Sequence, residues 1–213
     1  MKTSLKYTAI SLVILMISSC RNSEKRIPTR SQAPLILTEQ QIYSTDTTGI
    51  LIFWTAYKFS NKTGVSGTFN TSIYNPKNTI GNIETILTKS KLLIPTTSVN
   101  SGNAIRDFKL NTYFFKAFNT QELKATITKA TGNEGLVDLK MNGISKKIAF
   151  TYAIEKDTII LFTNLNLNYW KAEEALKILN TECYELHKGA DGISKLWPEV
   201  DVVVKIPVQK STL

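Results

Sequence analysis

The sequence has few of the residues that build catalytic and metal sites. Its 213 residues include one histidine and two cysteines. A Ser-His-Asp site would need His187, and a zinc site would need partners for it that only carboxylates or Cys183 could supply. No spacing typical of either site surrounds His187, and no glycine-rich phosphate loop or catalytic carboxylate pair stands out. We therefore predict no catalytic residue, no metal and no cofactor, and interpret His187 as a helix-terminal residue contacting the last carbonyls.

Long apolar runs and clustered charge are also missing. After the N-terminus no run of about 18 apolar residues could cross a membrane as a helix. The formal net charge is +9, but the basic residues are scattered rather than gathered in a stripe. This distribution disfavours nucleic-acid binding and is typical of a solvated surface near anionic lipid headgroups.

The N-terminus has the order of an export signal. Lys2 and Lys6 precede an apolar run over 7–16, which ends in Ile17-Ser18-Ser19-Cys20. Small residues before a cysteine match bacterial lipoprotein signals, in which the cysteine is lipidated and becomes the mature N-terminus. An ordinary signal peptide or membrane anchor with an incidental Cys20 is the alternative, although the run is too short to span a bilayer. We predict a signal peptide over 1–19 and a protein of the bacterial cell envelope, held by Cys20 at the outer membrane and facing the periplasm.

The mature chain is the size of one domain. Loss of 1–19 removes two lysines and no acid, so the formal charge falls from +9 to +7. Residues 20–35 are polar and contain Pro28 and Pro34, which predicts a flexible tether. The folded domain is expected over 36–213. If Cys20 carries lipid, Cys183 has no disulfide partner in the chain and is interpreted as a buried small hydrophobe, with a catalytic thiol as the alternative.

The segment 49–70 predicts the first hairpin of a β-barrel. Residues 50–59 are bulky on both faces of a strand, and the polar turn 61–64 is expected to supply the positive φ that a hairpin needs. Val65 to Asn70 then alternate, with Gly67 at a sharp bend. The other predicted strands are 82–94, 123–129, 136–141, 144–154, 158–163 and 200–208.

Two helices are expected beside these strands. Residues 101–110 predict a short helix capped by Ser101, and apolar residues spaced by three and four predict one long helix over 169–188, from Asn168 as cap to Gly189. The fold class is therefore all-β: an antiparallel, lipocalin-like barrel of about eight strands with one long and one short helix at the rim.

Four stretches carry a resemblance to a known family. They are Trp54-Thr55-Ala56-Tyr57-Lys58 with 64–69, Arg106-Asp107 with 110–115, Ala175-Leu176 with 179–183, and 186–200 with its Trp197-Pro198-Glu199-Val200. In this order they resemble the YceI-like lipid-binding (polyisoprenoid-binding) proteins, in particular a lipoprotein branch. The resemblance implies an exported barrel whose apolar interior holds an isoprenoid, quinone-like or fatty acyl tail, without a cofactor or known catalytic residues. The family often has histidine two residues after the Arg-Asp pair, where this sequence has Lys109.

Candidate ligand-binding residues follow from strand aromatics and from the Arg-Asp pair. Trp54, Phe69, Phe150, Tyr152 and Phe162 could line a cavity, although small barrels also fill their interior with such side chains. Arg106 could read a pyrophosphate or carboxylate headgroup, or else hold the short helix against the barrel. The expected partners are a long-chain isoprenoid or acyl lipid and, through the N-terminal lipid, a membrane. A structural barrel with a filled interior is the alternative function, and an enzyme acting on such a lipid is disfavoured.

Overall fold

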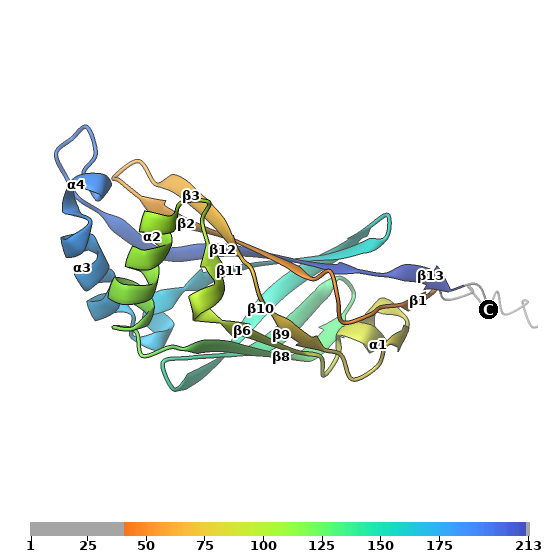
Figure 1. The fold of residues 1–213 in the computed structure, drawn as a ribbon. Helices are drawn as coiled ribbons and strands as arrows, with labels where there is room; N and C mark the ends of the chain where they lie inside the picture. Colours follow the sequence, from red (N-terminus) through yellow and green to blue (C-terminus); the bar gives the residue numbers. More distant parts are fainter. Residues whose placement is uncertain (1–40, 212–213) are drawn as a thin grey trace, which may run out of the picture. The chain divides into compact units, whose positions relative to one another are not determined.

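The computed structural model describes residues 41–211, which form one compact unit (Figure 1). Every strand pairing and both apolar cores given below lie in this range, so the unit holds the interactions it needs to fold by itself. The predicted signal peptide, Cys20 and the tether over 20–35 lie outside the described residues. Within 41–211, no helix has the length and apolar content needed to cross a bilayer.

The unit consists of antiparallel strands in two sheets. Ten strands form the main sheet in the order β4-β6-β8-β9-β10-β11-β12-β2-β3-β7, and three short strands form a second sheet in the order β13-β1-β5. The strands are β1 (Ile42–Ser44), β2 (Leu51–Lys58), β3 (Thr63–Phe69), β4 (Ile73–Asn75), β5 (Ile80–Gly81), β6 (Lys91–Pro95), β7 (Val99–Asn100), β8 (Glu122–Thr131), β9 (Glu134–Met141), β10 (Ile144–Glu155), β11 (Thr158–Asn166), β12 (Leu196–Pro207) and β13 (Gln209–Ser211).

The main sheet curls until its two edges meet. β6, next to one edge, is followed by the single 3-10 turn η1 (Thr96–Ser98) and then by β7 at the opposite edge. Asn70 donates its backbone N–H to the Ser98 carbonyl at 2.8 Å, which fixes this corner. The predicted all-β, lipocalin-like antiparallel fold is confirmed.

The helices gather at the two ends of the curled sheet. At one end lie α2 (Ala104–Lys109), the π-helical turn η2 (Leu110–Phe115), the 3-10 turn η3 (Leu167–Trp170), α3 (Glu173–Glu182) and α4 (Tyr184–His187). At the other end, α1 (Ile83–Leu87) lies beside the small sheet (Figure 1). The predicted short helix is α2, although Asn103 rather than Ser101 caps it, by accepting from the Arg106 N–H at 2.9 Å.

The strand predicted over 82–94 is wrong in its first half, where α1 forms. The side chain of Asn82 caps α1 by accepting from the Thr85 N–H at 2.8 Å. The sequence analysis missed this cap because the alternation of Thr and Ile is typical of a strand. Ile86 and Leu87 are adjacent and both fully buried. A strand would send neighbours to opposite faces, so burying both in one core requires the helical turn.

The single long helix predicted over 169–188 is also wrong, because the chain breaks it twice. Lys171 takes a left-handed conformation (φ 61°) and separates η3 from α3. Cys183 (φ −118°, ψ 21°) separates α3 from α4. The apolar spacing places residues of η3 and α3 and Cys183 in the second core, whereas α4 has no buried residue. Asn168 therefore caps nothing; α3 begins after Ala172 without a side-chain cap.

The first hairpin forms as predicted. Positive φ occurs at Lys62 (58°), within the predicted turn 61–64, and also at Phe59 (63°) just before it. Gly67 serves a close approach: a Cβ there would lie 2.3 Å from Trp54 Cζ2 and 2.6 Å from the Asn100 carbonyl oxygen. The Trp54 ring therefore lies flat against strand β3 where only glycine leaves room.

Two apolar cores lie at opposite ends of the barrel. The first, near α1, includes Tyr43, Ile86, Tyr152 and Ile206. The second, beneath the helices of the other end, includes Phe118, Trp170, Leu179 and Cys183. The space between them is not completely filled, and it leads to the candidate site.

Candidate ligand-binding site

An apolar cavity of about 130 Å³ lies inside the barrel between the two cores. Inward-facing residues of the strands line it, and their only polar side-chain groups besides the Trp54 indole are the hydroxyls of Tyr74, Ser90 and Thr163. The other lining residues are Ile52, Phe69, Leu92, Ile94, Leu123, Ala125, Ile127, Val137, Leu139, Met141, Phe150, Leu161, Leu165, Val202, Val204 and Ile206.

A second cavity of about 140 Å³ continues the first beneath the helices. Trp54, Phe69, Met141 and Leu165 border both. The second cavity adds residues from η2, α3 and β12: Leu110, Phe114, Phe115, Leu176, Leu179, Leu196, Trp197 and Val200. A cavity of about 150 Å³ holds a benzene-sized molecule, so a long tail needs both cavities together.

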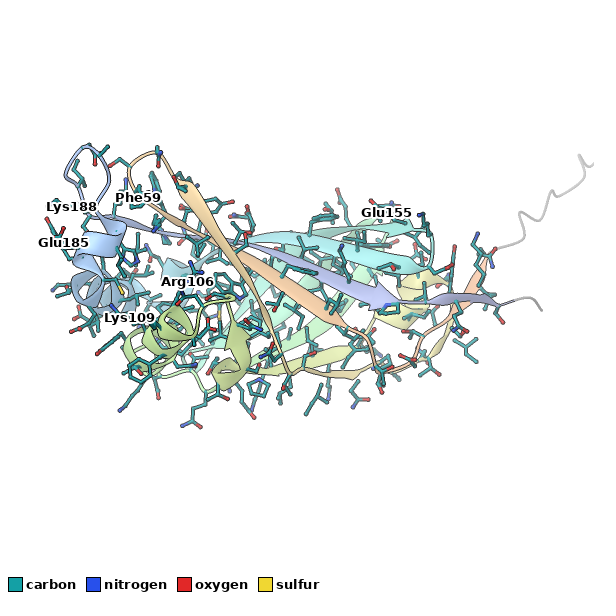
Figure 2. All side chains as sticks on the ribbon, turned by 45° about the horizontal axis from the view of Figure 1, so that its top comes forward. Phe59, Arg106, Lys109, Glu155, Glu185 and Lys188 are labelled. Carbon is teal, nitrogen blue, oxygen red and sulfur yellow. The ribbon has the colours of Figure 1, made fainter. Side chains whose placement is uncertain are left out.

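The mouth is a third space, of about 380 Å³, between β2, α2 and the α3–α4 junction. Trp54, Ala56, Leu110, Leu179 and Leu196 border both it and the second cavity, so the three spaces adjoin one another in a row. The other residues lining the mouth are Tyr57, Lys58, Val65, Asn103, Ile105, Arg106, Lys109, Cys183, Leu186 and His187. We define the charged mouth as Lys58, Arg106, Lys109 and His187; Arg106 and Lys109 are labelled on α2 in Figure 2.

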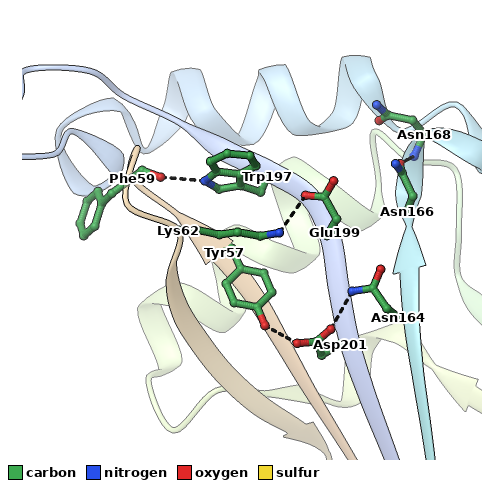
Figure 3. A network of polar contacts seen from close by, with 9 residues as sticks. All are labelled: Tyr57, Phe59, Lys62, Asn164, Asn166, Asn168, Trp197, Glu199 and Asp201. Atoms are coloured by element: carbon green, nitrogen blue, oxygen red, sulfur yellow. Dashed lines mark hydrogen bonds and ion pairs between the residues drawn. The ribbon is translucent and has the colours of Figure 1, made fainter. Parts of the chain in front are cut away.

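Polar contacts between β2, β11 and β12 hold one wall of the mouth (Figure 3). β12 has a bulge between Leu196 and Val200, opposite the end of β2. Trp197, within this bulge, donates its indole N–H to the Phe59 carbonyl at 2.7 Å. The Tyr57 hydroxyl donates to Asp201, whose other oxygen accepts from the Asn164 amide at 2.6 Å. These contacts position the end of β2, which carries Lys58 into the mouth.

Two lysines of the charged mouth bind the ends of the nearby helices. Lys58 Nζ donates to the Leu186 carbonyl at 2.9 Å, and Lys109 Nζ donates to the Glu182 carbonyl at 3.2 Å. Such carbonyls at a helix C-terminus carry partial negative charge and attract cations. These bonds hold both ammonium groups at the mouth from opposite sides.

His187 is a neutral member of the mouth. Its Nδ1 lies 3.0 Å from the Asn180 side-chain oxygen, which can only accept, so Nδ1 carries the proton. Burial, then the charges of Lys58 and Lys109, lower the pKa of His187 from 6.5 to about 4. The predicted contact of His187 with the last helix carbonyls is therefore wrong. Lys58 and Lys109 donate to the carbonyls at the helix ends, and the imidazole of His187 bonds to the side chain of Asn180 instead.

We expect this histidine to make the protein less stable in acid. Between pH 6.5 and 4, His187 is protonated in the unfolded chain but stays neutral in the folded chain. Proton binding therefore stabilises the unfolded state as the pH falls. Because the imidazole is partly exposed, the loss is on the order of 1 kcal/mol rather than the full value of the shift. Urea unfolding at pH 7 and pH 4 should show a smaller loss for His187→Gln than for the wild type, and parallel losses would contradict the assignment.

Comparison with known proteins identifies the family. Residues 43–207 match the YceI-like domain, which is most of the chain and nearly all of the described unit. The chain belongs to the YceI-like family. No curated protein sequence matches it significantly.

Solved structures show the same fold at low identity. A polyisoprenoid binding domain from Saccharophagus degradans is 14% identical and aligns with a TM-score of 0.56 over 79% of this chain and 98% of that chain. BcnA from Burkholderia cenocepacia is 12% identical and aligns with a TM-score of 0.50 over 78% of this chain and 99% of that chain. Both share the curled antiparallel barrel of this YceI-like chain.

Four of the residues predicted to bind a ligand lie along the three adjoining spaces. Trp54 borders all of them, Phe69 the two inner cavities, Phe150 the first cavity, and Arg106 the mouth. Tyr152 is buried in the first core instead and donates its hydroxyl to Glu84 at 3.3 Å. Ligand contact by these residues stays a prediction.

Phe162 does not line the cavity, contrary to what its strand pattern suggested. It is 45% exposed and pairs in register with Thr151, whereas the cavity is lined by its neighbours Leu161 and Thr163 and by Phe150. β11 carries apolar residues on both faces, so the sequence pattern could not tell which face was internal. A charged substitution at Phe162 is therefore expected to leave the cavity intact.

Lys58, Lys109 and His187 are the members of the site that sequence reasoning missed. Lys58 belonged to the motif that carried the family resemblance, and Lys109 was noticed only as a departure from histidine. Their spacing in the sequence does not indicate a shared site, because they lie on three different elements that meet only in the folded protein. Within 41–211 no group of three His, Cys, Asp or Glu side chains is arranged to hold a metal ion.

Cys183 lies at the inner edge of the mouth, and its thiol is buried and free. Burial, the largest effect, raises the pKa of this thiol and keeps it protonated, which makes it a poor nucleophile. Its position in the second core agrees with the interpretation as a small hydrophobe.

Proposed function

We propose that the protein binds or carries a long-tailed apolar molecule, such as a polyisoprenoid, a quinone-like lipid or a fatty acyl chain, in its barrel. The observation that carries this proposal is the row of adjoining, mostly apolar spaces from the first cavity, through the second, to the mouth. The S. degradans neighbour, described as a polyisoprenoid binding domain, supports it. The buried thiol of Cys183 also agrees with binding rather than catalysis, because its raised pKa keeps it protonated and makes it a poor nucleophile.

The energetics favour recognition of the tail. Each buried methylene contributes about 0.8 kcal/mol, against a substantial cost of lost ligand freedom. A tail that occupies both inner cavities therefore binds much better than one that reaches only the second. Affinity should rise with tail length until the first cavity is full.

Direct binding tests this function. The chain from residue 21 onward, delipidated after purification, is titrated with geranylgeraniol and with fatty alcohols of increasing length. Saturable quenching of intrinsic fluorescence is expected because Trp54, which is only 7% exposed, borders every part of the path. Absence of saturable binding by any long-chain isoprenoid, quinone or acyl compound in correctly folded protein would refute the proposal.

The proposal includes a lipid-anchored protein of the bacterial envelope, at the outer membrane and facing the periplasm. It rests on the Ile17-Ser18-Ser19-Cys20 pattern. Several acyl chains on Cys20 would hold the protein stably at a membrane, where one chain alone is marginal.

Loss of the anchor is expected when Cys20 is replaced by alanine. Cys20→Ala should abolish incorporation of labelled fatty acid during expression in a bacterium. Cys183→Ala is the matched control, since it removes the other cysteine of the chain and should label normally. Labelling of the Cys20→Ala protein would show that the lipoprotein interpretation is wrong.

A further inference from the structure

We propose that the charged mouth selects amphiphiles with an anionic headgroup, a phosphate or carboxylate, whose tail occupies the barrel. This inference rests on the proposed function, because it concerns the polar end of the same ligand. It adds a specificity that the apolar cavities cannot provide.

The first argument is the charge of the lining. Lys58, Arg106 and Lys109 face the mouth, and no aspartate or glutamate lines it. The ion pairs formed within 41–211 involve Lys62, Lys124, Lys177 and Lys188, so the three cations of the mouth have no carboxylate partner among the described side chains. Cations that are partly removed from water without counter-charge favour an anion.

The second argument is the donors that remain. An ammonium group has three N–H donors, and the contacts above use one each on Lys58 and Lys109. Arg106 donates from Nε to the Ser101 hydroxyl at 2.8 Å and from Nη2 to the Ser101 carbonyl at 3.1 Å, which leaves Nη1 available. Asp107, the adjacent acid, is directed elsewhere, since one of its oxygens accepts from the Ser101 N–H and hydroxyl at 2.8 and 2.6 Å.

The third argument is the surroundings of these donors. Ile105 and Leu186 border the mouth and are 71% and 58% exposed. Cys183 and the neutral His187 complete the inner edge. A headgroup seated among these side chains loses part of its water, which strengthens its hydrogen bonds to ammonium and guanidinium groups. An alcohol gains little from the same position.

The position of the mouth beside the apolar cavities argues for a lipid headgroup rather than a free anion. Trp54, Ala56 and Leu110 border both the mouth and the second cavity. A molecule with its anion at Lys58 and Lys109 therefore has an apolar channel directly behind it. Inorganic phosphate would use the cations but leave that channel empty.

The test compares two ligands that have the same tail but different headgroups. Geranylgeranyl phosphate and geranylgeraniol are titrated into the chain from residue 21 onward at pH 7.5. We expect the phosphate to bind at least about tenfold more tightly, as charge-assisted hydrogen bonds would give. The double variant Lys58→Gln/Lys109→Gln should lose most of this preference, measured as the ratio of its two affinities, and far-UV circular dichroism and urea unfolding check that it is folded.

A matched control keeps the net charge equal. Lys146→Gln/Lys147→Gln removes two exposed lysines from β10, away from the mouth, and should retain the preference. Arg106→Gln provides a second variant that leaves both lysine contacts with the helix ends in place, and it should reduce the ratio of phosphate affinity to alcohol affinity.

The single histidine supplies an independent readout. In tag-free protein the imidazole NMR signals belong to His187 alone. The groups acting on it are Lys58 from β2, Lys109 from α2 and, at the inner edge, Cys183. A bound anion offsets the two lysine charges, so geranylgeranyl phosphate should raise the pKa of His187 and geranylgeraniol should not.

The outcomes separate this inference from the proposed function. Equal binding of phosphate and alcohol would overturn the headgroup inference and leave the tail-binding function standing. A preference that survives in the Lys58/Lys109 variant would overturn the assignment to the mouth. Equal affinity for inorganic phosphate would identify a free-anion site instead. If neither isoprenoid binds, the proposed function itself fails.

Discussion

Replacing Ala125 by phenylalanine is expected to weaken binding of a long-tailed ligand by about fiftyfold. Ala125 lines the first cavity, between its strand partners Leu92 and Leu139. A phenyl ring in that space would displace the far end of a tail. Exclusion of three methylenes alone costs about 2.4 kcal/mol, which corresponds to that loss of affinity. Fluorescence titration with geranylgeraniol measures the effect.

Ala149→Phe is the matched control, because Ala149 is exposed on the outer face of β10 and the change in size is the same. This variant should bind normally. Ala125→Phe should be at least as stable as the wild type, since it fills an apolar void without adding charge. Unchanged binding in a stable Ala125→Phe protein would show that the tail does not use the first cavity.

Replacing Gly67 by alanine is expected to destabilise the protein by about 3 kcal/mol. The new methyl group would lie 2.3 Å from Trp54 Cζ2 and 2.6 Å from the Asn100 carbonyl oxygen, so a buried indole and a backbone strand would both have to move. Trp54 also donates its indole N–H to the Thr68 carbonyl at 3.1 Å, a bond that would be strained by the shift. Urea unfolding measures the change in the free energy of unfolding.

Gly64→Ala provides the comparison on the same strand. Its methyl group would lie 3.1 Å from Thr55 Cγ2 and 3.7 Å from Tyr57 Cε1, both side-chain atoms, and the stability should change by no more than about 0.5 kcal/mol. Because Trp54 borders all three spaces, Gly67→Ala should also reduce ligand affinity. Equal stability of the two alanine variants would refute the close packing of Trp54 against β3.

Strand positions and several turns could be predicted from the sequence because they depend on local patterns. The Asn142-Gly143 pair is an example: both residues have positive φ (46° and 70°), and Met141 pairs with Ile144 across a two-residue turn. Gly132 and Asn133 behave in the same way between β8 and β9. Such short turns fix the register of the strands that they join, so the antiparallel order β8-β9-β10 could be predicted from the sequence.

Helix boundaries were predicted less well because apolar spacing does not report a break. The residues from Trp170 to Cys183 have helical periodicity, yet the left-handed Lys171 and the break at Cys183 divide the segment. Tertiary packing decides these boundaries, because η3 and α3 contribute residues to the second core on either side of the first break. In the same way, α1 forms over 83–87 because Ile86 and Leu87 are both buried in the first core.

The sequence by itself determined the antiparallel barrel class and the strands that carry its apolar faces, because alternation and turn chemistry act over a few residues. Only the tertiary structure decided which face of β11 is internal, and so separated Phe150 in the cavity from Phe162 outside it. It alone placed Lys58, Lys109 and His187 around one mouth, since these residues come from β2, α2 and α4. Their meeting depends on strand register and helix packing between distant segments, which no local pattern encodes.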